Sequence, residues 1–218
     1  MKYELVIFDV DGTLLDTSEG VLSSVKYTIE RFGFDMPDDK QLRTFIGPPI
    51  QRSFADTFGL SGDIIQEMTA VFRDRYKGDD LIKAVSYEGI YECFDSLESN
   101  GIKTAIATYK RDDYAQRIMK HFHFDDHTKI IHGADDNNKL SKSDIIEICI
   151  NESGIPKEKV LMVGDTDNDA IGAEGIGVDF LAVTFGFGFK PGEEITYPHV
   201  HVSDTAADIA SFVLKGVS

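Results

Sequence analysis

Two carboxylic acids, Asp9 and Asp11, directly follow an apolar run over residues 5–8. The run has no polar alternation, which predicts a strand buried on both faces, as in the parallel sheet of an α/β domain. Ligands of open α/β sheets bind beyond the carboxyl ends of the strands, so we expect both acids at the mouth of a site. Gly12 lets the chain turn there. A carboxylate pair in this position can act as nucleophile and as acid or base.

Other polar side chains follow later predicted strands or precede a predicted helix, namely Thr108, Lys142, Asp165 and Asp169. A carboxylate attacks phosphorus only when its charge is screened, which requires a divalent cation with oxygen ligands. Asp9 and Asp165 can hold the cation. Asp11 can protonate the leaving oxygen and then take a proton from water. Thr108 and Lys142 can bind phosphoryl oxygens, so the set predicts phosphoryl transfer through an aspartate.

The elements that position these groups form two blocks. Between residues 16 and 83, apolar residues recur at three- and four-residue steps, and no strand is predicted. From residue 84 onwards, helices alternate with strands that we expect over residues 102–108, 130–131, 160–163, 180–185 and 199–202. This predicts an α/β fold, a doubly wound parallel sheet with an inserted all-helical cap domain. We expect a core domain of residues 1–15 and 84–218 and a cap domain of residues 16–83.

Composition limits the partners and the location. The formal net charge of −16 argues against nucleic acid and against an anionic membrane surface. Cys93 and Cys149 give no disulfide framework, which favours a reducing compartment. No apolar run approaches the roughly 18 residues of a membrane span, and no signal peptide precedes residue 5. We therefore expect a soluble cytoplasmic protein without a membrane partner; no pattern sets its oligomeric state.

Four segments resemble the motifs of the haloacid dehalogenase superfamily, in the order of that family. FDVDGTLLD at residues 8–16 resembles the first motif, and ATYK at 107–110 resembles the second. Lys142 resembles the third, and GDTDND at 164–169 resembles the fourth. The inserted helical block, FIGPPIQRSF within it and FGFG at 185–188 are similar to the phosphoglycolate-phosphatase-like branch. The match extends over nearly the whole chain and implies a Rossmann-like core.

This resemblance implies a Mg²⁺-dependent phosphatase that hydrolyses a small phosphorylated metabolite. Asp9 would be the nucleophile that becomes an aspartyl phosphate, and Asp11 would be the general acid and base. The Asp9 side chain, the Asp11 main-chain carbonyl and Asp165 would hold Mg²⁺. Asp169 would lie close to the metal in a supporting or water-mediated role.

The resemblance also assigns the phosphate and the cap. Thr108 and Lys142 would grip the phosphate, and Lys142 would offset the charge of Asp9. Lys110 and Lys139 are rivals for this role, but Lys142 immediately precedes a predicted helix, whose N-terminus also favours phosphate. The helical block would be the mobile cap that closes over the substrate and excludes water.

Three further residues are candidates for substrate binding. Gly47 and the two prolines after it form a rigid break between predicted helices, a usual place for a specificity loop in the family. Arg52 follows that break and either contacts the substrate or is a solvated helix residue. Tyr109 stands after Thr108, where the family usually has a small Ser or Asn, and its ring is expected to narrow the pocket.

The same residues leave several alternatives open. A sugar phosphomutase shares the core, and cap side chains would decide between it and a phosphatase. A receiver-type signalling module also uses an aspartate, Mg²⁺, Thr and Lys, but lacks the acid pair and the helical insertion. A dehalogenase of this fold needs neither a metal nor Asp11. The substrate stays open among phosphoglycolate, pyrophosphate, a nucleoside monophosphate and a sugar phosphate.

Overall fold

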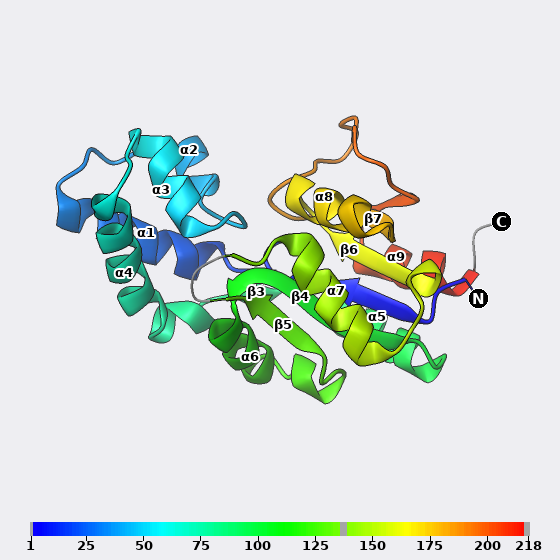
Figure 1. Ribbon diagram of the computed structural model, residues 1–218. Helices are drawn as coiled ribbons and strands as arrows, with labels where there is room; N and C mark the ends of the chain where they lie inside the picture. The colour runs from blue at the N-terminus through cyan, green and yellow to red at the C-terminus, as the bar shows by residue number, and fades with distance from the viewer. Residues whose placement is uncertain (1, 136–138, 216–218) are drawn as a thin grey trace. The chain divides into compact units, whose positions relative to one another are not determined.

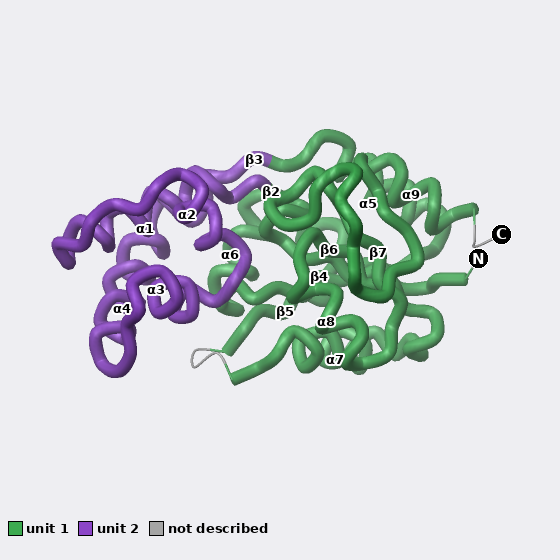
Figure 2. The backbone as a smooth tube through the Cα atoms, turned by 90° about the horizontal axis from the view of Figure 1, so that it is seen from above, with its two compact units in different colours: residues 1–15, 86–218 green, residues 16–85 purple. Residues whose placement is uncertain are grey.

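The chain divides into two compact units. The structure, a computed structural model, describes residues 2–135 and 139–215. Unit 1 comprises Met1–Leu15 and Ser86–Ser218, and unit 2 comprises Asp16–Val85 (Figure 2). The short strands β2 (Leu15–Asp16) and β3 (Val85–Ser86) pair with each other where the chain passes between the units.

A six-stranded sheet forms the centre of unit 1. Its order is β5-β4-β1-β6-β7-β8, and every pairing is parallel (Figure 1). The strands are β1 (Leu5–Phe8), β4 (Lys103–Arg111), β5 (Ile131–Ala134), β6 (Val160–Gly164), β7 (Asp179–Val183) and β8 (His201–Ser203). This confirms the predicted parallel sheet. β4 is longer than expected, because it continues three residues beyond Thr108.

The register of the three central strands brings their carboxyl ends to one level. Phe8, the last residue of β1, pairs with Ile106 of β4 and with Val163 of β6. The Asp9 backbone N–H then donates a hydrogen bond to the Val163 carbonyl at 3.0 Å. The next residues on each strand therefore meet at one edge of the sheet, as the sequence predicted.

Helices cover both faces of this sheet. They are α5 (Ile90–Ser99), α6 (Asp112–His121), α7 (Lys142–Ser153), α8 (Asp167–Ile176) and α9 (Ala206–Lys215), with single turns at Phe124–Asp126 and Lys157–Lys159. On one face Leu5 and Ile7 of β1 lie in a buried cluster with residues of α7 and α8. On the other face Phe8 stacks on Phe94 of α5, with ring centroids 4.7 Å apart. The alternating directions of the β1 side chains explain why the whole strand is buried.

Unit 2 consists mainly of helices, which are α1 (Ser18–Phe32), α2 (Asp39–Arg43), α3 (Ile50–Phe58), α4 (Asp63–Tyr76) and the single turn η1 (Asp79–Ile82). Its core contains Phe54, whose ring lies edge-on to Phe45 at 5.2 Å and to Phe72 at 6.4 Å. α2 has only five residues. A capping box at Asp38 starts it, and irregular backbone before Gly47 ends it. No helix among the described residues has the length and hydropathy to cross a membrane.

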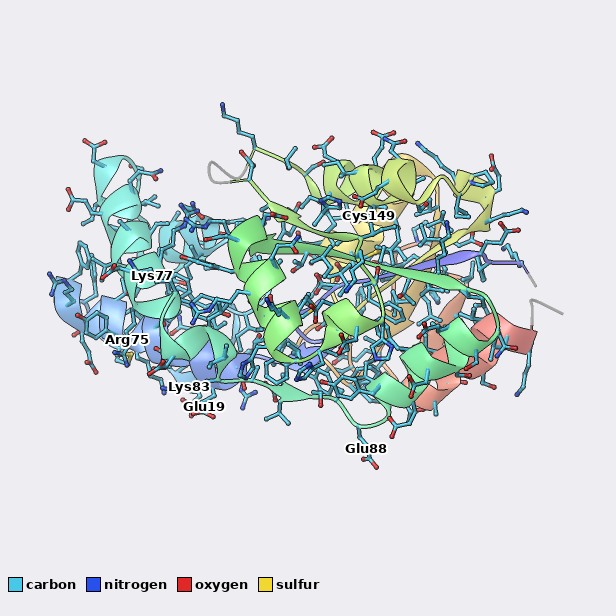
Figure 3. All side chains as sticks on the ribbon, turned by 90° about the horizontal axis from the view of Figure 1, so that it is seen from below. Glu19, Arg75, Lys77, Lys83, Glu88 and Cys149 are labelled. Atoms are coloured by element: carbon cyan, nitrogen blue, oxygen red, sulfur yellow. The ribbon has the colours of Figure 1, made fainter. Side chains whose placement is uncertain are left out.

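A buried carboxylate, Asp80, ties the elements of unit 2 together. Only 2% of Asp80 is exposed, and it accepts hydrogen bonds from the hydroxyls of Ser23 and Ser24 at 2.9 Å. Arg75 Nε donates to it at 3.0 Å and Lys83 Nζ at 2.7 Å; Figure 3 shows both cations on the same side of this unit. Burial opposes ionisation of Asp80, but the bonds from Lys83 and the serines, with the charge of Arg75, outweigh it and lower its pKa.

Asp80→Asn is expected to destabilise the protein by about 1–3 kcal/mol at pH 7, because an amide cannot balance two cations that the fold holds in place. Since folding lowers the pKa of Asp80, this stabilisation is present above the unfolded value of about 4 and disappears as the pH falls through the lower folded value. Urea unfolding at pH 7 and at pH 3 measures the difference. The exposed neighbour Asp79→Asn is the control; equal stabilities of the two variants at pH 7 would contradict the assignment.

Candidate active site

Three predicted site carboxylates meet beyond β1 and β6. Asp9 follows β1, Asp165 follows β6, and Asp169 lies in the first turn of α8. A carboxylate oxygen from each lies within 4.8 Å of the other two, and all three residues are buried. Three acids at this separation repel one another strongly in a site that excludes water, so the site requires positive charge.

Lys142 supplies part of that charge. Its Nζ lies 2.6 Å from Asp9 Oδ1 and 2.7 Å from Asp169 Oδ1, and its side chain is only 3% exposed. Gly172 of α8 makes room for it, since a Cβ there would lie 2.6 Å from Lys142 Cγ. The pairing of Lys142 with Asp9 agrees with the sequence expectation that this lysine offsets the nucleophile's charge.

The start of α7 corrects one detail of the sequence reasoning. Lys142 does not precede the helix but is its first residue, and a capping box between Ser141 and Asp144 fixes that end. The Lys142 backbone N–H already donates to the Tyr109 hydroxyl at 3.0 Å. This N–H is therefore already bound and does not attract phosphate, and Lys142 contributes to the site through its ammonium group.

Asp165 accepts hydrogen bonds from backbone groups, which no side-chain motif predicts. Its Oδ2 accepts hydrogen bonds from the backbone N–H groups of Phe187 at 2.7 Å and Gly188 at 3.1 Å. A Cβ at Gly186 would lie 2.4 Å from the same oxygen, and one at Gly12, whose φ is +85°, would lie 2.1 Å from it. Glycine is required at both positions because the backbone approaches the carboxylate so closely. The FGFG segment thus supports a site residue, which the sequence reasoning missed.

The second oxygen of Asp165 indicates what the site is built to hold. Asp165 Oδ1 is buried and has no hydrogen-bond partner among the described residues. A buried carboxylate oxygen without a partner is costly, and a hard divalent cation with oxygen ligands removes that cost. Asp9 and Asp165 therefore fit Mg²⁺. Asp169 is also close enough, although Lys142 and the Thr166 hydroxyl, at 2.8 Å, already bind its two oxygens.

The site strongly perturbs its titratable groups. Burial, followed by the charges of Asp169 and Asp11, raises the pKa of Asp9 to about 7 against the opposing effect of Lys142. Burial and the charges of Asp169 and Asp9 also raise the pKa of Asp165 well above its usual range. Burial alone would lower the pKa of Lys142, but the charges of Asp169 and Asp9 raise it instead. Lys142 is therefore a permanent cation, whereas the carboxylates need further positive charge to ionise together.

Asp11 has a cationic partner that the sequence reasoning assigned no role. Lys110 Nζ lies 3.0 Å from Asp11 Oδ1, and the side chains are 5% and 9% exposed. The sequence offers Lys110 only as a rival of Lys142 for phosphate. The sequence does not predict that β4 extends to Arg111. This extension places Lys110 beyond Thr108, at the sheet edge where Asp11 lies. Each of the two acids of the first motif therefore pairs with its own lysine.

Lys110→Met is expected to lower kcat by about tenfold, because Asp11 loses the charge that orients its carboxylate. Steady-state kinetics with a chromogenic phosphomonoester measure the effect. Lys120→Met is the control, since Lys120 is exposed on α6. A kcat equal to that of the control would show that the ion pair does not contribute to turnover.

The remaining candidates lie as follows. Thr108 is 1% exposed near the end of β4, and its Oγ1 accepts a hydrogen bond from the Lys110 N–H at 3.2 Å. Gly47, with φ of 99°, lies between α2 and α3 of unit 2. Arg52 lies in α3, and its Nε is 3.5 Å from Asp56 Oδ2 on an exposed face. Substrate contact by Gly47, Arg52 and Tyr109 stays a prediction.

Comparisons with known proteins find relatives over most of the chain. The family model described as haloacid dehalogenase-like hydrolase matches residues 6–183. A 5'-nucleotidase of Pseudomonas aeruginosa is 34% identical over 208 residues, which are 95% of this chain and 94% of that protein. The tyrosine-protein kinase PtkA of Mycobacterium tuberculosis is 31% identical over 85% of this chain and 63% of its own length. The crystal structure of a predicted phosphatase from Clostridium acetobutylicum superimposes with a TM-score of 0.91, at 28% identity, over 99% of this chain and 100% of its own.

Proposed function

Since this chain belongs to the haloacid dehalogenase-like hydrolase family, we propose that it hydrolyses a small phosphomonoester through a phosphoryl group carried on Asp9, with Mg²⁺ in the site. The chain is a phosphatase of this family. The metal, the covalent intermediate, the residue roles and the substrate are the proposed parts.

One observation carries the proposal. Asp9 faces Lys142 at 2.6 Å, while the neighbouring Asp165 presents a buried oxygen without a partner. A nucleophilic carboxylate needs its charge screened before it approaches an anionic phosphate, and this arrangement supplies a fixed ammonium on one side and a place for a cation on the other. Asp9, the main-chain carbonyl of Asp11, and Asp165 would hold Mg²⁺, with Asp169 in support. The bound ion would neutralise the acids and the phosphoryl oxygens.

In the first step an oxygen of Asp9 bonds to phosphorus, and the bond between phosphorus and the substrate oxygen breaks. Asp11 gives its proton to the departing oxygen, so the substrate leaves as an alcohol. Lys142 and the Thr108 hydroxyl bind the phosphoryl oxygens and hold the group in line with Asp9. Asp11 leaves this step as a carboxylate, the form that the ammonium of Lys110 at 3.0 Å stabilises.

In the second step Asp11 takes a proton from water, and the resulting hydroxide bonds to phosphorus. The bond between phosphorus and the Asp9 oxygen breaks, which releases inorganic phosphate and restores the Asp9 carboxylate. Lys142 stabilises that returning charge. Asp11 ends the cycle protonated, ready for the next substrate.

Unit 2 is proposed to be the cap that closes over the substrate, with Gly47 and Arg52 contacting the part of the substrate that does not react. The 34% sequence identity with a 5'-nucleotidase, which extends over 95% of this chain, supports a nucleoside monophosphate as the first substrate to test. A cytoplasmic location is also proposed, which the two buried cysteines, Cys93 and Cys149, support as free thiols.

A substrate and metal screen tests the proposal. We expect the purified protein to release phosphate from at least one of phosphoglycolate, pyrophosphate, nucleoside monophosphates and sugar phosphates when Mg²⁺ is present. EDTA should abolish this release, and Mg²⁺ in excess of EDTA should restore it, because the ion would screen the charges of Asp9 and of the phosphoryl oxygens. Ca²⁺ at the same concentration is the matched control for Mg²⁺, because Ca²⁺ prefers more oxygen ligands, at longer distances, than Mg²⁺ does.

Two results would overturn parts of this function. Turnover that is insensitive to EDTA would remove Mg²⁺ from the scheme. A product in which the phosphoryl group appears on a second hydroxyl of a sugar phosphate, with no inorganic phosphate, would replace hydrolysis by the phosphomutase reaction.

A further inference from the structure

Tyr109 makes two contacts with Lys142 that involve different parts of both residues. Its hydroxyl accepts a hydrogen bond from the Lys142 backbone N–H at 3.0 Å. The centroid of its ring lies 5.7 Å from Lys142 Nζ. The ring is partly buried and packs against the cluster between the sheet and α7. A single side chain from the end of β4 therefore reaches both ends of the lysine next to Asp9.

The hydroxyl contact adds a tie to the start of α7 beyond the capping box. The first N–H groups of a helix have no partner within the helix, and the Ser141 hydroxyl accepts that of Asp144 at 3.2 Å. The Tyr109 hydroxyl takes the N–H of Lys142, the first helical residue. The backbone from which the Lys142 side chain extends is thus tied directly to β4, the strand beside β1.

The ring contact acts on the other end of the side chain. An ammonium within about 6 Å of an aromatic face is attracted to it, and more so where water is excluded. Lys142 Nζ is therefore held by Asp9, by Asp169 and by the ring of Tyr109. A small Ser or Asn at position 109 has no ring and could not provide the third contact.

We propose that Tyr109 is a positioning residue, which acts through Lys142 and keeps its ammonium at the distance from Asp9 at which the phosphoryl group is transferred. The effect of Tyr109 on catalysis rests on the proposed function, whereas the hydroxyl contact with Lys142 does not. Packing alone does not explain the residue, because a phenylalanine would fill the same space without binding the N–H.

Tyr109→Phe separates the two contacts, because it deletes the hydroxyl and keeps the ring. We expect kcat to fall about three- to tenfold, the equivalent of one ordinary hydrogen bond, with KM changed less than about twofold. The amide proton of Lys142 should exchange with solvent at least about tenfold faster in the variant, measured by NMR. Tyr109→Ser, which also loses the ring, should lower kcat further.

Tyr91→Phe is the matched control. The Tyr91 hydroxyl also bonds to a backbone group, but as a donor, to the Phe122 carbonyl at 2.8 Å, and Tyr91 belongs to α5 rather than to the site. We expect this variant to keep the wild-type kcat and the wild-type exchange of the Lys142 amide. Melting temperatures of both variants report any loss of stability. If the two variants are equally stable, kcat should still be lower in Tyr109→Phe than in Tyr91→Phe.

The amide measurement decides the structural part of the inference without any turnover. Unchanged exchange at Lys142 in Tyr109→Phe would overturn it, whether or not the protein is a phosphatase. Faster exchange with unchanged kcat would also overturn it, because Tyr109 would then hold the helix without positioning the ammonium. Failure of the wild-type protein to release phosphate from any substrate would overturn the proposed function and the catalytic consequence, while the exchange result would still decide the contact.

Discussion

Asp9→Asn is expected to abolish turnover, lowering kcat by on the order of 10⁴-fold or more, because an amide oxygen does not form the bond to phosphorus. The variant also loses the charge that Lys142 faces at 2.6 Å. Phosphate release measured with the best substrate of the screen gives the effect. Intact-mass analysis after rapid acid quenching should detect no phosphoryl group on the variant.

A matched control is Glu88→Gln, the same chemical change at an exposed acid of unit 1, labelled in Figure 3. It should retain wild-type kcat. Because asparagine has the shape of aspartate, Asp9→Asn should fold, which circular dichroism checks. More than a few per cent of wild-type activity, after deamidation back to aspartate has been excluded by mass, would rule out Asp9 as the nucleophile.

Asp11→Asn is expected to separate the two chemical steps. With a substrate whose leaving group needs no proton, such as p-nitrophenyl phosphate, Asp9 should still be phosphorylated. Hydrolysis of the phosphoryl group should slow by about 10²- to 10⁴-fold, because no base takes the proton from water. The variant should therefore show a burst of nitrophenol equal to one enzyme equivalent, followed by slow turnover.

The same variant should be much weaker on an alkyl phosphate, whose leaving oxygen requires a proton in the first step. Mass analysis should find the phosphoryl group on the protein during p-nitrophenyl phosphate turnover. Full activity on both substrates would contradict the acid and base role of Asp11. A variant that neither turns over p-nitrophenyl phosphate nor becomes phosphorylated by it would contradict the expectation that the first step with this substrate proceeds without Asp11.

The central part of the site was readable from the sequence because strand burial and strand ends carry a strong signal. Residues 5–8 and 160–163 are apolar without interruption, so the acids that follow them mark the edge of a parallel sheet. Asp9 and Asp165 indeed lie there with Asp169. The ordered motifs added the expectation that Lys142, far away in sequence, faces Asp9.

The parts that the sequence did not reveal depend on polar residues within regular elements. The apolar pattern of β4 stops at Ala107, yet the strand continues to Arg111, because Tyr109 and Lys110 have partners inside the protein instead of facing solvent. The sequence predicts a strand that ends at Thr108. Backbone N–H groups bind the Asp165 carboxylate. Because residues of almost every type carry such a group, the sequence does not indicate these bonds, apart from the nearby glycines.

The pairing of β1 has a consequence for how the protein acquires its structure. Leu5 pairs with Lys103 on one side and with Val160 on the other. The strand that precedes Asp9 therefore has no partner in the sheet until β4 has been made, and it lacks its second partner until β6 follows. Unit 2 contains only residues 16–85 and can form its own core in the meantime. During synthesis β1 is thus an unpaired apolar segment that needs protection from aggregation, and pairings so distant in sequence make sheet assembly the slow part of folding.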